Sequence, residues 1–288
     1  MFVVGAAMGS FLTCQAWRLK NKLDGKKSLG KRSVCLSCKK QLKWYDNIPV
    51  ISWLTLRGKC RYCGKKIGAT EILAEVLMGA AFVLVSLNVD IEGLVAEPSA
   101  LKIISYVATL ALLMGLGFLA IYDGKWGELP NFALIISCVV AFIMVVLKYT
   151  DGVHTLEGIW GELAAVTMLG GLYLVLYLAS QGKWVGNGDW ILGVIVGLVL
   201  GNAWLALIAL FISNALGTIV MYPFVKKQKD KRIHFGPFLV AGCVIVMSFA
   251  DVFMSLIRFW VKLVVDFFEM RVGDVGIDLG SGNVGVTE

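Results

Sequence analysis

Apolar runs long enough to cross a lipid bilayer recur along most of this sequence of 288 residues. The hydrocarbon core of a bilayer is about 30 Å thick and needs roughly 20 apolar residues in a helix. A spanning segment must also satisfy its own backbone hydrogen bonds there, which helices do. Only 16% of the residues are charged, whereas soluble domains carry about 25%. The sequence therefore predicts an all-α polytopic membrane protein.

We predict about eight transmembrane helices. They cover Met1–Trp17, Ile72–Leu87, Leu101–Tyr122, Phe132–Lys148, Ile159–Ala179, Trp190–Leu200, Ala203–Pro223 and Phe235–Ala250. The two runs that begin at Trp190 and Ala203 leave open a single broken hairpin in that region. After the last span, residues 251–271 mix apolar side chains with charges, which is typical of an amphipathic helix on the membrane surface.

The basic residues predict the orientation of the chain. Of 27 Lys and Arg residues, 15 lie in the range Arg18–Lys66 and five in the range Lys226–Arg232. Cytoplasmic loops are rich in Lys and Arg, so we expect both ranges inside and the N-terminus outside. The loops Asp123–Asn131 and Ser180–Asp189 then also lie inside. Membrane topology and contact with anionic lipid account for this positive charge, so nucleic acid is not an expected partner.

Four of the seven cysteines form two CxxC motifs in the first basic range. The motifs are Cys35-Leu-Ser-Cys38 and Cys60-Arg-Tyr-Cys63, with 21 residues between them. Two such knuckles complete a tetrahedral thiolate shell for zinc, and a closed shell of this kind is structural. A segment of about fifty residues with little apolar mass needs such support to fold. The alternative, a pair of redox motifs, is typical of a thioredoxin-like βαβ unit, which the sequence lacks.

Two aspartates stand at the predicted cytoplasmic ends of membrane spans. Asp123 ends one apolar run, and Asp189 begins another after Gly186-Asn-Gly188. Ionisable groups at membrane depth are unfavourable and indicate function. Asp189 can instead cap its helix, but an acid at a helix C-terminus such as Asp123 opposes the helix dipole. Because Gly186 and Gly188 lack Cβ atoms, a substrate backbone can approach them closely.

Two neighbouring carboxyl groups can share one proton, which is the chemistry of aspartic peptidases. The chain has no GxSxG or HExxH motif, and its two histidines, His154 and His234, are expected on opposite sides of the membrane. We therefore predict Asp123 and Asp189 as a catalytic pair at the cytoplasmic membrane edge. The alternative is a non-enzymatic scaffold or transporter that carries a zinc knuckle. A transporter would place its acids near the bilayer midplane.

Further short motifs accompany the aspartates and cysteines between the start of the chain and about residue 242. They are Gly9-Ser-Phe-Leu12, Arg32–Cys38, Trp44–Val50, Ser52-Trp-Leu54, Arg57–Gly64, Glu75, Leu129-Pro-Asn131, Gly186–Asp189 and Phe235-Gly-Pro-Phe238. In these motifs the chain resembles the bacterial type IV prepilin peptidases, the leader peptidases and N-methyltransferases of type IV pili, type II secretion and competence pseudopili.

The resemblance implies an aspartic endopeptidase of the GxGD type in the bacterial inner membrane, with Asp123 and Asp189 at the two catalytic positions. Such an enzyme cuts the basic leader from prepilins or pseudopilins after a glycine at the cytoplasmic face. Many relatives then methylate the new N-terminus with S-adenosylmethionine as the methyl donor. The resemblance assigns no residues to that donor.

The chain departs from the family pattern at three places. Ile191 stands where a Lys is frequent after the GxGD aspartate, and Leu36 replaces a common Pro. The stretch Thr70-Glu71-Ile72 stands where Arg-Tyr-Pro is frequent. The last departure lies near the methylase segment, so it concerns methylation rather than cleavage.

Four parts of the chain follow from these features. They are a first span at residues 1–17, a cytoplasmic tetracysteine zinc domain at 18–70, a membrane peptidase core at 71–250, and an amphipathic helix with a flexible tail at 251–288. The tail contains a GxGxxG pattern at Gly280–Gly285. It lacks the helix and βαβ unit that a cofactor loop needs, so we do not expect a cofactor there.

Overall fold

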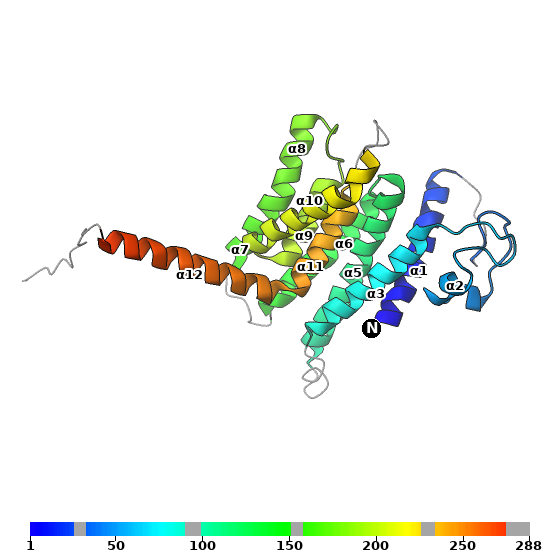
Figure 1. The fold of residues 1–288 in the computed structure, drawn as a ribbon, viewed down its shortest axis with the longest axis horizontal. Helices are drawn as coiled ribbons and strands as arrows, with labels where there is room; N and C mark the ends of the chain where they lie inside the picture. Colours follow the sequence, from blue (N-terminus) through cyan, green and yellow to red (C-terminus); the bar gives the residue numbers. More distant parts are fainter. Residues whose placement is uncertain (26–32, 90–98, 151–157, 226–233, 275–288) are drawn as a thin grey trace, which may run out of the picture. The chain divides into compact units, whose positions relative to one another are not determined.

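The computed structural model describes residues 1–25, 33–89, 99–150, 158–225 and 234–274. The basic range Lys226–Arg232, most of the predicted outer loops and the GxGxxG pattern at Gly280–Gly285 lie outside the described residues. The described residues are almost wholly helical (Figure 1), and they contain only two isolated β-bridges, both beside the cysteines. This agrees with the predicted all-α class.

Among the described residues, ten α-helices and one π-helix make up the larger part of the fold. In chain order they are α1 (Phe2–Leu23), α3 (Ala69–Leu87), α5 (Ala100–Trp126), α6 (Asn131–Thr150), α7 (Gly158–Val166), the π-helix η2 (Thr167–Gly171), α8 (Leu172–Ser180), α9 (Asp189–Leu200), α10 (Ala203–Val225), α11 (Gly236–Ser248) and α12 (Ala250–Asp274). Between α1 and α3, the part of the cysteine segment that the structure describes has only the short 3-10 helix η1 (Trp44–Asn47) and α2 (Ile51–Thr55).

Within the described ranges of the chain, five helical segments are long and apolar enough to cross a membrane. They are Ala69–Leu87, Ala100–Trp126, Asn131–Thr150, Gly158–Ser180 and Ala203–Tyr222. A sixth candidate arises only if α11 and α12 are counted as one broken span. The chain is therefore an integral membrane protein. Every predicted span corresponds to a helix or a continuous helical segment, although α1, α9 and α11 do not meet the criterion by themselves.

The predicted spans at Trp190 and Ala203 are two separate helices joined by a tight turn. Gly201 takes a left-handed conformation with φ 60° and ends α9. The side chain of Asn202 then accepts a hydrogen bond from the backbone N–H of Trp204, 2.9 Å away, at the start of α10. With only 12 residues, α9 is short, yet Leu192, Ile195 and Val196 on it are fully buried. Its neighbours therefore shield α9 from lipid.

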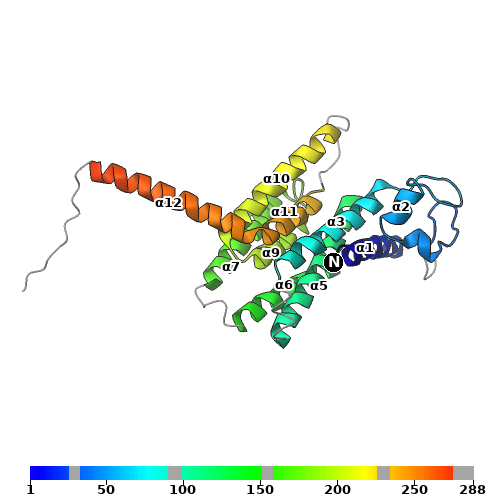
Figure 2. The ribbon, with the colours of Figure 1, turned by 60° about the horizontal axis from the view of Figure 1, so that its bottom comes forward.

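Glycine allows close approach between helices at two places that position the site. A Cβ atom on Gly5 would lie 2.5 Å from the carbonyl oxygen of Met78, so α1 and α3 are in backbone contact, as Figures 1 and 2 show. A Cβ on Gly197 of α9 would lie 2.7 Å from the Cα atom of Val166 at the end of α7. Small residues at such contacts are typical of membrane helices.

The chain divides into two units after Ser248, and α12 belongs to the second unit. Helix α12 covers the segment predicted to be amphipathic, and apolar side chains such as Phe259 and Trp260 are exposed on it. Its position on the membrane surface stays a prediction.

Candidate active site

Asp123 lies in the last turn of α5 and is buried, with 5% of its surface exposed. Its Oδ2 atom accepts a hydrogen bond of 2.9 Å from the backbone N–H of Gly236, the first residue of α11. A Cβ atom on Gly236 would lie 2.7 Å from the same oxygen. Helix α5 ends four residues later at Gly127, which has φ 66° and donates its N–H to the carbonyl of Asp123. The Asp123 carboxylate is thus held by a segment 113 residues away.

Asp189 is the first helical residue of α9, and Gly188 is the N-cap residue. The Oδ2 atom of Asp189 accepts a hydrogen bond of 2.7 Å from the backbone N–H of Gly186. Gly186 and Asn187 are exposed, so the loop before Asp189 is open to solvent or to a substrate. Asp189 is therefore not the N-cap residue of α9, which was the alternative. Its side chain accepts a hydrogen bond from Gly186, which precedes the N-cap residue Gly188.

The loops that carry the two aspartates are neighbours, although 66 positions separate Asp123 from Asp189 in the sequence. The charge of Asp189 acts electrostatically on Asp123. A Cβ atom on Gly188 would lie 2.6 Å from the Cβ atom of Leu129, so the GxGD loop packs against the loop after Asp123. This close approach gives Gly188 a packing role in addition to the substrate approach expected from the sequence.

His234 is a neighbour of this site that the sequence did not indicate. Its imidazole also acts electrostatically on Asp123. A Cβ on Gly127 would lie 2.7 Å from its Nε2 atom, so the ring lies against the end of α5. The available signal was its position in the sequence, immediately before the family-like motif Phe235-Gly-Pro-Phe238.

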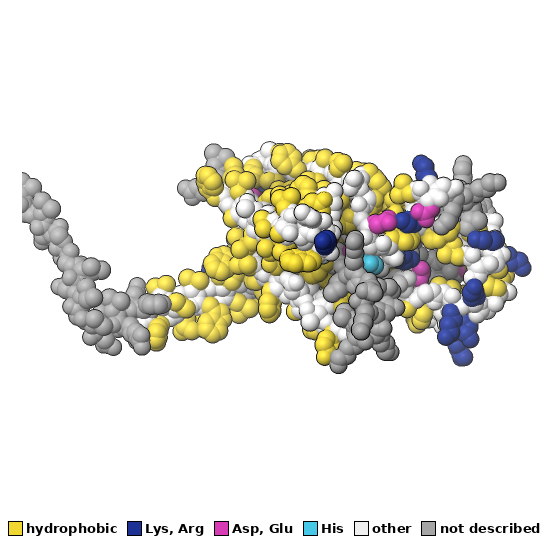
Figure 3. All heavy atoms as spheres, turned by 90° about the horizontal axis from the view of Figure 1, so that it is seen from above, with side chains coloured by type: hydrophobic (Ala, Val, Ile, Leu, Met, Phe, Trp, Pro, Cys, Tyr) yellow, Lys and Arg dark blue, Asp and Glu magenta, His cyan; other side chains and the backbone are white. Residues whose placement is uncertain are grey.

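Polar contacts join the cysteine segment and the aspartate loops at one end of the bundle. Lys125 pairs with Glu71 at 2.8 Å, and Lys20 pairs with Glu128 at 2.8 Å. The backbone N–H of Val50 donates to Glu75 Oε2 at 2.8 Å. Lys and Arg side chains gather over the cysteine segment, whereas hydrophobic side chains dominate most of the rest of the face seen in Figure 3.

The four cysteines of the CxxC motifs converge on one point. All four Sγ atoms lie within 4.8 Å of one another. The two knuckles have matching backbones: the N–H of Cys35 donates to the Lys40 carbonyl, and the N–H of Cys60 donates to the Lys65 carbonyl, both at 2.9 Å. In each knuckle the fourth residue after the first cysteine is left-handed, with φ 60° at Lys39 and 69° at Gly64.

The surroundings of Cys35 favour its thiolate form. Burial raises its pKa, but hydrogen bonds from the backbone N–H groups of Cys38 and Ser37 lower it to about 6. Thiolates are the metal-binding form of cysteine. Four converging sulfur atoms match a closed tetrahedral zinc shell, whereas two independent redox motifs would not need to meet. The residues present therefore fit a structural zinc ion.

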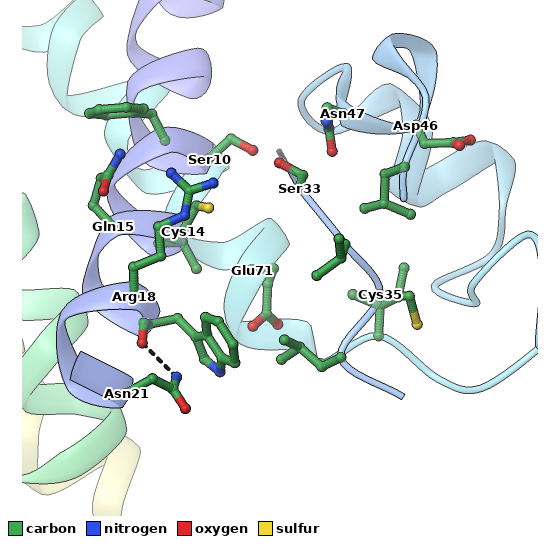
Figure 4. A pocket seen from close by; sticks show the side chains of 18 of the residues that line it. Ser10, Cys14, Gln15, Arg18, Asn21, Ser33, Cys35, Asp46, Asn47 and Glu71 are labelled. Atoms are coloured by element: carbon green, nitrogen blue, oxygen red, sulfur yellow. Dashed lines mark hydrogen bonds between the residues drawn. The ribbon is translucent and has the colours of Figure 1, made fainter. Parts of the chain in front are cut away.

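A cavity of about 1560 Å³ lies between α1, the cysteine segment, the start of α3 and the end of α5. Figure 4 shows Arg18 of α1 and Glu71 of α3 among the side chains that line this space. Trp17, Phe11 and Lys125 also line it. The sequence did not indicate this cavity, because its walls come from five separate segments, including Phe132 at the start of α6.

The cavity and the aspartates lie on different sides of α5. Lys125 lines the cavity, and it follows Asp123 by two residues on the same helix. Two residues correspond to about 200° of rotation around a helix. The last turn of α5 therefore separates the two regions.

Comparisons with known proteins agree with the resemblance found in the motifs. Residues 3–89 match the model of the bacterial peptidase A24 N-terminal domain. Three relatives named prepilin leader peptidase/N-methyltransferase come from Klebsiella pneumoniae, Bacillus subtilis and Vibrio cholerae. The first is 30% identical and covers 72% of this chain and 86% of the relative. The relative from Bacillus subtilis is 26% identical and covers 91% of this chain and 97% of its own length. The relative from Vibrio cholerae is 26% identical and covers 88% of this chain and 95% of its own length. No solved structure matches the chain.

Proposed function

Because this chain belongs to the prepilin leader peptidase/N-methyltransferase family, and is therefore an enzyme, we propose that Asp123 and Asp189 are its peptidase dyad. The observation that carries the proposal is the environment of Asp123. This buried carboxylate accepts a backbone hydrogen bond and lies within the electrostatic reach of a second carboxylate. Two neighbouring carboxylates disfavour double ionisation, so the pair can hold one proton between them.

The reaction is hydrolysis of one peptide bond. The ionised carboxylate takes a proton from water as the water oxygen bonds to the carbonyl carbon, and the protonated carboxyl gives its proton to the carbonyl oxygen. The bond from carbon to nitrogen then breaks, the amine leaves with a proton from the dyad, and the leader keeps a new carboxyl group. Asp189 follows an exposed glycine loop, which provides the approach for an extended substrate backbone.

The substrates we propose are prepilins or pseudopilins, cut after a glycine at the cytoplasmic face of a bacterial inner membrane. Three acids at this end are candidates to hold the basic leader, together with anionic lipid. Glu75 already accepts a hydrogen bond from the Val50 N–H, and Glu71 already forms an ion pair with Lys125. Glu128 pairs with Lys20, but 57% of its side chain is exposed. Glu128 is therefore the best placed of the three to meet a Lys or Arg of the leader.

Zinc at Cys35, Cys38, Cys60 and Cys63 has a structural role in this proposal. The segment around them has only two short helices and few buried apolar side chains. Metal binding supplies folding free energy in domains of this kind. The knuckles also form part of the cavity wall, since Cys35 and Cys60 line it. Zinc therefore supports the cavity without taking part in the chemistry.

We place the methyl donor, S-adenosylmethionine, in this cavity. Its residues fit the molecule: Arg18 suits a carboxylate, Glu71 suits ribose hydroxyls or an ammonium group, and Trp17 and Phe11 offer faces for adenine. When bound, the donor supplies an electrophilic methyl group for the amine of the cleaved substrate. Small-molecule sites usually measure about 300–1,000 Å³, so a cavity of about 1560 Å³ has room for a donor and an acceptor end.

The test is mass spectrometry of a prepilin-like peptide incubated with purified protein, with and without S-adenosylmethionine. We expect a cut after glycine that disappears in Asp123→Asn and Asp189→Asn, and a gain of one methyl group only with the donor. Zinc content and thermal unfolding show that the variants are folded. Measurable turnover in either variant would contradict the dyad. The absence of any cut by folded, zinc-loaded protein would favour a scaffold.

A further inference from the structure

Tyr173 packs against the helix that carries Asp189. It lies in the first turn of α8, and a Cβ atom on Gly193 would lie 3.1 Å from its Cδ2 atom. Gly193 follows Asp189 by four residues on α9. Residues four apart lie on the same face of a helix. The Tyr173 ring is therefore one helical turn from Asp189, on the side from which the carboxylate projects.

The same ring also packs against the segment that holds Asp123. The centroids of the Tyr173 and Phe235 rings lie 5.7 Å apart. Phe235 immediately precedes Gly236, whose N–H donates to the Asp123 carboxylate. Tyr173 thus contacts elements from both halves of the candidate active site.

The hydroxyl of Tyr173 is buried and has no hydrogen-bond partner among the described residues. Only 5% of the residue is exposed, and the charge of Asp189 acts on it. A buried hydroxyl without a partner destabilises a fold, so each instance calls for an explanation. A hydrogen-bond acceptor that arrives only with the substrate explains why the Tyr173 hydroxyl has no partner here.

The backbone before Tyr173 is irregular in a way that changes its direction. The π-helix Thr167–Gly171 interrupts the membrane segment between α7 and α8. A π turn inserts one residue, which rotates all later side chains by about 100° relative to an unbroken α-helix. Gly170 within it lies so close to α9 that a Cβ would come within 2.5 Å of the Val194 side chain. Such insertions are frequent at functional sites.

We propose that the Tyr173 hydroxyl is a catalytic hydrogen-bond donor, and that its acceptor is the carbonyl oxygen of the scissile peptide bond. This inference rests on the proposed dyad. The carbonyl oxygen gains negative charge as water attacks, and a donor already oriented toward it stabilises that charge. The hydroxyl keeps its proton throughout and forms no covalent bond.

The test is Tyr173→Phe, which keeps the ring contacts with Gly193 and Phe235 and removes only the hydroxyl. Loss of one such donor lowers kcat by roughly 100-fold or more, and we expect a change of that order with KM nearly unchanged. The melting temperature is expected to stay equal or to rise, since an unsatisfied buried group is removed. Methylation of a pre-cleaved peptide is expected at the wild-type rate.

Tyr122→Phe is the matched control. Its hydroxyl is also buried without a partner among the described residues, and it precedes Asp123 directly. Its ring packs on Trp126, and the charges that act on it come from Lys20, Glu128 and Asp24 instead of Asp189. We expect unchanged kcat in this variant.

Three outcomes would overturn the role of Tyr173. They are a kcat for Tyr173→Phe close to wild type, equal losses in both tyrosine variants, and a fall in melting temperature that accompanies the loss of activity. Turnover in Asp123→Asn would instead contradict the proposed dyad of Asp123 and Asp189. Failure of the dyad can therefore be distinguished from failure of the proposed role of Tyr173.

Discussion

The ammonium group of Lys125 and the carboxylate of Glu71 lie 2.8 Å apart, and this pair joins the last turn of α5 to the first turn of α3. Both residues line the cavity, while Asp123 lies on another face of the same turn of α5. One helical turn therefore separates the proposed peptide cleavage from the proposed methyl transfer. We expect the new N-terminus to pass around the end of α5, near Gly127.

The first prediction concerns this ion pair. Lys125→Met should lower methylation of a pre-cleaved peptide several-fold, because it removes a cation from the cavity wall and releases Glu71. Cleavage should change less than about threefold, and stability by about 1 kcal/mol or less, as is usual for a partly exposed pair. Separate mass-spectrometric rates for the two steps provide the measurement.

Lys20→Met is its control. It breaks the pair with Glu128 at the same end of the protein, but Lys20 does not line the cavity. Methylation should therefore be unaffected. Equal loss of cleavage and methylation in Lys125→Met would show that the pair has a general structural role.

The second prediction concerns donor binding itself. Arg18→Met should weaken binding of S-adenosylhomocysteine, measured by calorimetry, by at least tenfold, because a charge-assisted contact to the ligand carboxylate is lost. Arg57→Met changes an exposed arginine of the cysteine segment outside the cavity and should bind normally. Unchanged affinity in Arg18→Met would place the donor elsewhere, whatever the peptidase activity.

The third prediction concerns the partner of Asp123. Gly236→Ala adds a Cβ atom 2.7 Å from the Asp123 Oδ2 atom, so the carboxylate or α11 must move. Cleavage should fall by about 100-fold, since small displacements of catalytic groups have effects of this size. Gly124→Ala is the control, because its Cβ would meet only Pro237, at 3.4 Å. Normal cleavage by Gly236→Ala would show that the contact between Gly236 and the Asp123 carboxylate is not needed for activity.

The fourth prediction concerns zinc. Cys60 is the most buried of the four cluster cysteines, and Cys60→Ser should lose the metal as measured by elemental analysis. The cysteine segment should then unfold at a lower temperature, because the metal contributes to its folding. Cys138→Ser, far from the cluster in the sequence, should keep one zinc per chain. Stoichiometric zinc in Cys60→Ser would refute the four-cysteine site.

Much of the fold could be predicted because the bilayer restricts a chain to few solutions. Apolar runs in the sequence located the helical segments, and the two ranges rich in Lys and Arg predicted which ends of these segments lie inside. The break of one predicted span at Thr167–Gly171 could not be predicted. Its residues Thr-Met-Leu-Gly-Gly include no proline and no charge to mark a break, and Gly170 among them packs closely against Val194 of α9.

The candidate site was predictable in its residues and not in its geometry. Asp123, Asp189 and the four cysteines stand out because carboxylates at membrane depth and paired CxxC motifs have few other uses. His234, Tyr173 and the cavity carry no such local pattern. Each depends on which helices become neighbours, and that is decided by close packing between segments far apart in the chain.

The sequence by itself determined the class of the protein, its helical segments, its four candidate metal-binding cysteines and its two candidate catalytic acids. These follow from hydrophobicity, charge and ligand spacing, which are local properties of the chain. Only the tertiary structure decided that Gly236 holds Asp123, that Tyr173 contacts both halves of the site, and that α5 separates the cavity from the aspartates. Such relationships arise from the packing of helices against one another, which no local pattern in the sequence specifies.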